Sequence, residues 1–127
     1  MLEKQFQFTR MLGQLYTWMT EQGITWVLGD AWRSTDKLQC AHCGRSHSYQ
    51  ELLVHNRKSK TVKSKHCDRC AQDLIIFIEN KPQWKGEPYR AVGEKWEALG
   101  GRWGGRFGVI PEKYATEIGW DPGHFEL

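Results

Sequence analysis

Apolar residues near the N-terminus recur at three- and four-residue spacing, which is the period of a helix with one buried face. They are Phe8, Leu12, Leu15 and Met19. Gly23 follows them and provides a natural stop, because glycine readily takes the left-handed conformation that ends helices. We therefore predict an amphipathic helix over residues 4–22.

The next apolar run has the composition of a buried strand. Residues 24–28 read ITWVL, and the run continues to AWR at 31–33. Residues 72–79 predict another strand. The helical period returns after Pro88, which can open a helix, and Gly100 ends it. The apolar residues of this second helix are Val92, Trp96 and Leu99.

Polar and small residues occupy the segments between the predicted helices and strands. Residues 34–48 are predicted as a polar loop, and SYQE at 48–51 is a capping-box pattern that predicts a short helix. The glycine-rich residues 100–106 predict a turn or loop, and the tail 121–127 turns and then alternates like a last strand. With no internal repeat or linker, the pattern predicts one small α+β domain with a short antiparallel sheet.

Composition agrees with a folded domain. The chain has 127 residues, 39% hydrophobic and 26% charged, which argues against disorder and against a membrane span. Because no apolar segment with a cleavage site follows the N-terminus, we expect synthesis in the cytoplasm without a signal peptide. The net charge is +3, and residues 57–65 hold five bases and no acid. Such a stretch attracts nucleic acid or an anionic cell envelope, or is simply a solvated loop.

The four cysteines form two Cys-x-x-Cys pairs, Cys40 with Cys43 and Cys67 with Cys70. Two such pairs can supply the four thiolates of a structural zinc site. Disulfides are less favoured in a cytoplasmic protein. Unpaired thiols and a redox motif are the alternatives. A four-cysteine zinc site together with the basic residues 57–65 would also fit a zinc-ribbon module that binds nucleic acid.

A second set of residues could hold a different metal. His66, Asp73 and His124 are candidate ligands, and Asp121 precedes His124 by three residues. Two histidines and one carboxylate leave a coordination position open for water, as hydrolytic zinc sites do. A straight strand would hold His66 and Asp73 about 23 Å apart, so they can share a metal only if the chain reverses between them.

Two segments resemble the signatures of the zinc D-Ala-D-Ala carboxypeptidase and L-alanyl-D-glutamate peptidase family, which includes many phage endolysins. Residues 64–74, SKHCDRCAQDL, resemble its S-x-H-x-x-G-x-A-x-D segment, and residues 120–127, WDPGHFEL, resemble its D/E-x-x-H segment. Residues 99–105 resemble the loop that usually precedes the second signature. The resemblance covers nearly the whole chain except residues 38–62.

The resemblance implies a role for each matched residue. His66, Asp73 and His124 would hold a catalytic zinc, and Asp121 would be the general base. Arg33 matches an arginine near the substrate, where it could polarise the scissile carbonyl or hold a carboxylate; it could equally be a surface residue that ends a strand. Ser64 matches a motif serine and is expected to be structural.

The chain departs from the family pattern at two places. Arg69 stands where the family has glycine, so the turn cannot rely on free access to the left-handed conformation. Residues 38–62 look like an insertion within a single catalytic domain that spans 1–127. If Cys40 and Cys43 share one structural zinc with Cys67 and Cys70, that ion would brace the loop between His66 and Asp73.

The expected function is therefore a zinc peptidase that cuts the peptide stem of bacterial peptidoglycan, with L-Ala–D-Glu as the preferred bond. Trp103, Phe107 and Trp120 would wall the cleft or simply pack in the core. We expect a monomeric phage-type endolysin that reaches the cell wall after release, without nucleic-acid partner or membrane insertion. A D-Ala-D-Ala carboxypeptidase or dipeptidase, a non-enzymatic zinc ribbon and an inactive family member are the alternatives.

Overall fold

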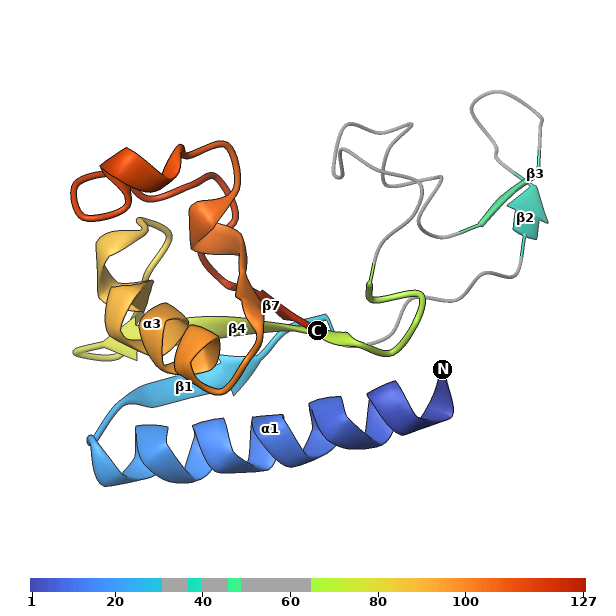
Figure 1. Cartoon of the computed structure of the whole chain (residues 1–127), viewed down its shortest axis with the longest axis horizontal. Helices are drawn as coiled ribbons and strands as arrows, with labels where there is room; N and C mark the ends of the chain where they lie inside the picture. The colour runs from blue at the N-terminus through green and yellow to red at the C-terminus, as the bar shows by residue number, and fades with distance from the viewer. Residues whose placement is uncertain (31–36, 40–45, 49–64) are drawn as a thin grey trace.

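The computed structural model describes residues 1–30, 37–39, 46–48 and 65–127 (Figure 1). Arg33, Cys40 and Cys43 lie outside the described residues, as does most of the short helix predicted after residue 48. No helix among the described residues is both long and apolar enough to cross a membrane.

Helix α1 (Leu2–Glu21) confirms the first prediction. Its buried side chains, one turn apart, are Phe8, Met11, Leu15 and Met19. The helix ends where expected, because Gly23 has φ +71° and its N–H donates to the Thr20 carbonyl at 3.1 Å.

A five-stranded antiparallel sheet forms the centre of the domain. Strands β1 (Thr25–Leu28), β4 (Ala71–Ile78), β7 (His124–Glu126) and β6 (Arg102–Trp103) lie side by side in that order, and β5 (Lys81–Pro82) also pairs with β4. All these pairs are antiparallel, as predicted.

Strand β1 is shorter than predicted, ending at Leu28 rather than at residue 33. Two further backbone hydrogen bonds follow its end. The Gly29 N–H donates to the Asp73 carbonyl at 2.8 Å, and the Asp73 N–H donates to the Asp30 carbonyl at 2.7 Å. Residues 29–30 therefore stay fixed against β4 at the position of Asp73.

The second helix begins later than predicted. Pro88 lies in a 3-10 turn, η1 (Glu87–Tyr89), and α3 (Arg90–Ala98) follows it. Two further 3-10 turns, η2 (Gly104–Arg106) and η3 (Pro111–Lys113), connect β6 to the C-terminal segment. The prediction of a polar loop over 34–48 was wrong in part, because β2 (Lys37–Gln39) and β3 (Ser46–Ser48) pair as a two-stranded antiparallel sheet.

The glycine-rich segment is more regular than predicted. Trp103 is buried and pairs with Phe125, so residues 102–103 form β6 instead of a loop. The glycines make room for indole rings, since a Cβ at Gly93 or Gly105 would overlap the Trp103 ring and one at Gly101 would overlap the Trp96 ring. Close packing against tryptophan explains these small residues.

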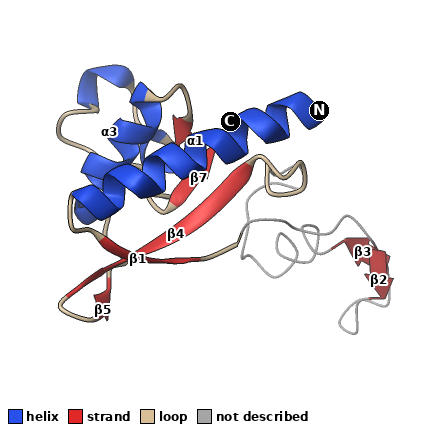
Figure 2. Cartoon of the chain, turned by 90° about the horizontal axis from the view of Figure 1, so that it is seen from below, coloured by secondary structure: helices blue, strands red, loops and turns tan. Residues whose placement is uncertain are grey.

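Both helices cover the same face of the sheet (Figure 2). Phe8 of α1 meets Trp96 of α3 edge-to-face, with ring centroids 5.7 Å apart, and Leu74 and Ile76 of β4 join the same core. Side chains alternate between the two faces of a strand. Asp73 therefore points to the face opposite the helices, where it is only partly buried.

Candidate metal centre

The strand register brings Asp73 and His124 together. In the β4–β7 pair, Asp73 lies directly opposite His124, and both side chains occupy the face away from the helices. Phe125, between His124 and Glu126, points into the core. A one-residue slip would exchange these faces, so burial of Phe125 fixes the side on which His124 lies.

His66 reaches the same place because the chain reverses before β4. The Cys70 N–H donates to the Lys65 carbonyl at 3.0 Å, and the Arg69 N–H donates to the His66 carbonyl at 3.2 Å. The reversal required by the seven-residue spacing is thus present. Arg69 adopts φ +58°, the left-handed conformation that glycine takes more easily, so the turn takes this conformation at a cost that a glycine would not carry.

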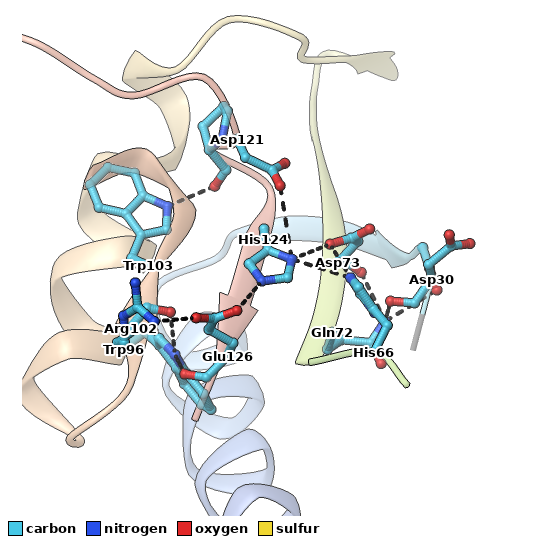
Figure 3. Close-up of polar contacts among 12 residues, drawn as sticks. Asp30, His66, Gln72, Asp73, Trp96, Arg102, Trp103, Asp121, His124 and Glu126 are labelled. Atoms are coloured by element: carbon cyan, nitrogen blue, oxygen red, sulfur yellow. Dashed lines mark hydrogen bonds and ion pairs between the residues drawn. The ribbon is translucent and has the colours of Figure 1, made fainter. Parts of the chain in front are cut away.

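The three side chains converge on one point (Figure 3). His66 Nε2 lies 3.1 Å from Asp73 Oδ1 and 3.2 Å from His124 Nδ1, and His124 Nδ1 lies 3.1 Å from Asp73 Oδ1. A tetrahedral zinc ion with bonds of about 2.0–2.1 Å holds its ligand atoms about 3.3 Å apart. The donor set and its spacing fit a zinc ion with one position left for another ligand.

Glu126 orients the His124 ring from behind. His124 Nε2 donates to Glu126 Oε2 at 2.8 Å, and Glu126 Oε1 accepts from Arg102 Nη1 at 2.8 Å. Because the ring proton lies on Nε2, the neutral imidazole presents an unprotonated Nδ1 to His66 and Asp73. This is the carboxylate–histidine arrangement that commonly supports metal ligands.

The electrostatics of the cluster favour an ion pair in the metal-free chain. Burial opposes the charge on both groups, yet hydrogen bonds from His124 and His66 lower the pKa of Asp73 to about 2. Likewise, hydrogen bonds to Asp73 and Glu126 overcome burial and raise the pKa of His124 to about 9. The imidazolium therefore stabilises the metal-free fold fully below pH 6.5, and this contribution is lost as pH rises through about 9. Binding of a metal at Nδ1 must displace that proton.

Asp121 lies at the rim of the cluster. Its Oδ2 is 3.9 Å from His124 Nδ1, and its side chain is 41% exposed. The turn that carries it is fixed at several points: the Trp103 indole N–H donates to the Pro122 carbonyl at 2.7 Å, and the Leu74 N–H donates to the Gly123 carbonyl at 2.8 Å. Asp121 is thus held close to the cluster while it remains accessible to solvent.

The aromatic residues near the site differ in role. Phe107 contacts His124, with ring centroids 5.7 Å apart, and Trp120 lies against Phe107 and is 55% exposed. Trp103 is buried in the core, so it does not wall a cleft. For Trp103 the alternative of simple packing is correct.

The comparison with solved structures finds a similar chain fold. The crystal structure of the Serratia marcescens L-Ala D-Glu endopeptidase ChiX superposes with a TM-score of 0.53 and 21% sequence identity, over 82% of this chain and 67% of that chain. The two chains share a fold. No protein-family profile matches the sequence, and no curated protein matches it.

In this fold, the four residues singled out from the sequence converge at one end of β4 and β7. Their side chains come from the turn before β4, from β4 itself, from the segment that leads into β7 and from β7 itself. They are His66, Asp73, Asp121 and His124.

The role of Glu126 was missed by sequence reasoning, although the two-residue strand period places Glu126 on the same face as His124. Arg102 was missed because only the β6–β7 register puts it opposite Glu126.

The two described cysteines lie in the turn between His66 and Asp73. Both are free thiols; Cys70 is buried and Cys67 is partly buried. Burial raises the pKa of the Cys70 thiol, with a smaller contribution from Asp68. Zinc binding at this pair would therefore require loss of a thiol proton.

The contact between Glu126 and His124 predicts a measurable effect on metal affinity. Glu126→Gln removes the carboxylate that fixes the Nε2 proton, so the zinc dissociation constant should rise about 10- to 100-fold. Competition with a chromophoric chelator measures this constant. Glu112→Gln, a matched change at an exposed residue, should leave it unchanged; equal zinc affinity in both variants would contradict the orienting role of Glu126.

Proposed function

We propose that the chain is a zinc-dependent peptidase that hydrolyses the peptide stem of bacterial peptidoglycan, with the L-Ala–D-Glu bond as its preferred target. The observation that carries this proposal is the convergence of His66, Asp73 and His124 on one point. Their placement in a fold shared with an L-Ala D-Glu endopeptidase supports the substrate class. The same proposal includes three further points. The protein is a phage-type endolysin, it reaches the cell wall after release, and it acts as a monomer.

Each residue of the cluster has a distinct task. His66, Asp73 and His124 would hold the ion, and Glu126 keeps His124 in the tautomer that offers Nδ1. When bound, zinc supplies Lewis acidity to the scissile carbonyl and makes a water molecule more acidic. Phe107 restricts the site beside His124.

Asp121 is proposed as the general base. Its carboxylate takes a proton from the attacking water as the new carbon–oxygen bond forms, and it passes that proton to the amine as the carbon–nitrogen bond breaks. An exposed carboxylate 3.9 Å from His124 Nδ1 is close enough to reach a water in the open position. Arg33 is proposed to hold a substrate carboxylate or polarise the carbonyl.

Removal of the base tests this mechanism. Asp121→Ala should lower kcat on purified Gram-negative peptidoglycan by about 10²- to 10⁴-fold while zinc content stays the same. Mass spectrometry of the products should show a new L-Ala carboxyl end, whereas release of D-Ala would indicate the carboxypeptidase alternative. Glu117→Gln, at an exposed acid outside the cluster, serves as the control. Equal activity of Asp121→Ala and wild type, with metal retained in both, would refute the mechanism.

We further propose that Cys40, Cys43, Cys67 and Cys70 share a second, structural zinc. Cys40→Ser with Cys43→Ser should lower zinc content from two ions per chain to one and lower the melting temperature, because thiolate ligation contributes folding energy. His124→Ala should also remove one ion, and the combined variant should bind none. Metal analysis of purified protein decides this: two ions in the double-serine variant would be incompatible with a shared site.

A further inference from the structure

A cavity of about 360 Å³ opens beside the metal centre, on the same face of the sheet. Asp73 and Asp121 line it, so it is continuous with the cluster. Its size lies at the lower end of the range for small-ligand sites. The remaining lining comes from the segment after β1, from β4, from the segment after β5, from η1 and from the turn before β7, and includes Asp30, Leu74, Gln83, Trp84, Tyr89 and Gly123.

Fixed backbone forms the walls of this cavity. The buried Tyr89 hydroxyl donates to the Gln83 carbonyl at 2.8 Å and accepts from the Ile76 N–H at 3.1 Å. This pair of bonds ties the segment that carries Trp84 to β4. On the other side, the Leu74 N–H bonds the Gly123 carbonyl. The cavity is therefore formed before any ligand binds.

Trp84 is displayed to solvent in the wall of this fixed cavity. Its side chain is 73% exposed and takes no part in the hydrophobic core. A large exposed aromatic ring beside a polar cavity offers a face for a cation or an apolar group. Because the ring lies outside the core cluster, its face is available to a ligand that enters the cavity.

The charge of the cavity lining favours a cation over an apolar group as the ligand. Among the described residues that line the cavity, three are acidic and none is basic. Asp73 and Asp121 lie beside the position of a bound divalent ion, and Asp30 is a third acidic residue of the lining. In Figure 3, Asp73 lies between His124 and Asp30, so Asp30 is the acidic residue of the two that lies farther from His124. A cationic group is favoured there and a carboxylate is disfavoured.

We propose that this cavity is the subsite for a stem-peptide residue that carries an ammonium group, with Trp84 as its packing surface and Asp30 as its counter-charge. The proposal rests on the proposed function. The diamino acid of a peptidoglycan stem supplies such a group within a few residues of the scissile bond. Trp84 and Asp30 then determine specificity and take no part in proton transfer.

The test compares two substrates on one enzyme. Zinc-loaded wild type is given a muropeptide whose diamino acid has a free side-chain ammonium group, and the same muropeptide with that amine acetylated. Acetylation should lower kcat/KM about five- to tenfold, because the cation–π contact and the charge pair are both lost. Trp84→Ala and Asp30→Asn should each lower the ratio of the two kcat/KM values, and the double variant should bring it to near one.

Controls separate this subsite from other effects. Trp84→Phe keeps an aromatic face and should keep most of the preference, and Glu112→Gln, which changes net charge at an exposed residue outside the cavity lining, should keep all of it. Equal cleavage of the two substrates by wild type, or a preference that survives both Trp84→Ala and Asp30→Asn, would overturn the subsite and leave the proposed function standing. No cleavage of either substrate would overturn the proposed function and the subsite with it.

Discussion

The antiparallel pairing of β4 with β7 is the constraint on which the site depends. It places Asp73 opposite His124, and the same register puts Phe125 into the core between two residues that face the cluster. The register is held from the core side, where the Trp96 indole N–H donates to the Glu126 carbonyl at 3.0 Å. Burial of apolar side chains on the helix-covered face of the sheet therefore fixes the positions of the polar side chains on the opposite face.

The cluster also carries a cost that zinc would relieve. Two imidazoles and two carboxylates are crowded within hydrogen-bond distance, and His66 and His124 are both buried. Without a metal, this arrangement needs a proton on His124 and ionised carboxylates to satisfy it. A divalent cation replaces that proton and brings additional charge compensation, so metal binding and folding should be coupled.

Much of the fold was predictable because the local spacing of apolar residues determines where helices and strands form. The spacing of Phe8 and Leu15 gave α1, and the apolar run at 72–79 corresponds to β4. The candidate ligands came from motif spacing. Sequence could not show that Arg69 would take a left-handed conformation, or that Trp103 would join a strand. These outcomes depend on packing between segments far apart in the chain.

Crystallography of the zinc-loaded protein at the zinc absorption edge tests the central claim most directly. We predict an anomalous peak within about 2.0–2.2 Å of His66 Nε2, His124 Nδ1 and Asp73 Oδ1. A zinc-loaded crystal that shows zinc only at cysteine sulfurs, or no peak within bonding distance of these three atoms, would contradict the account.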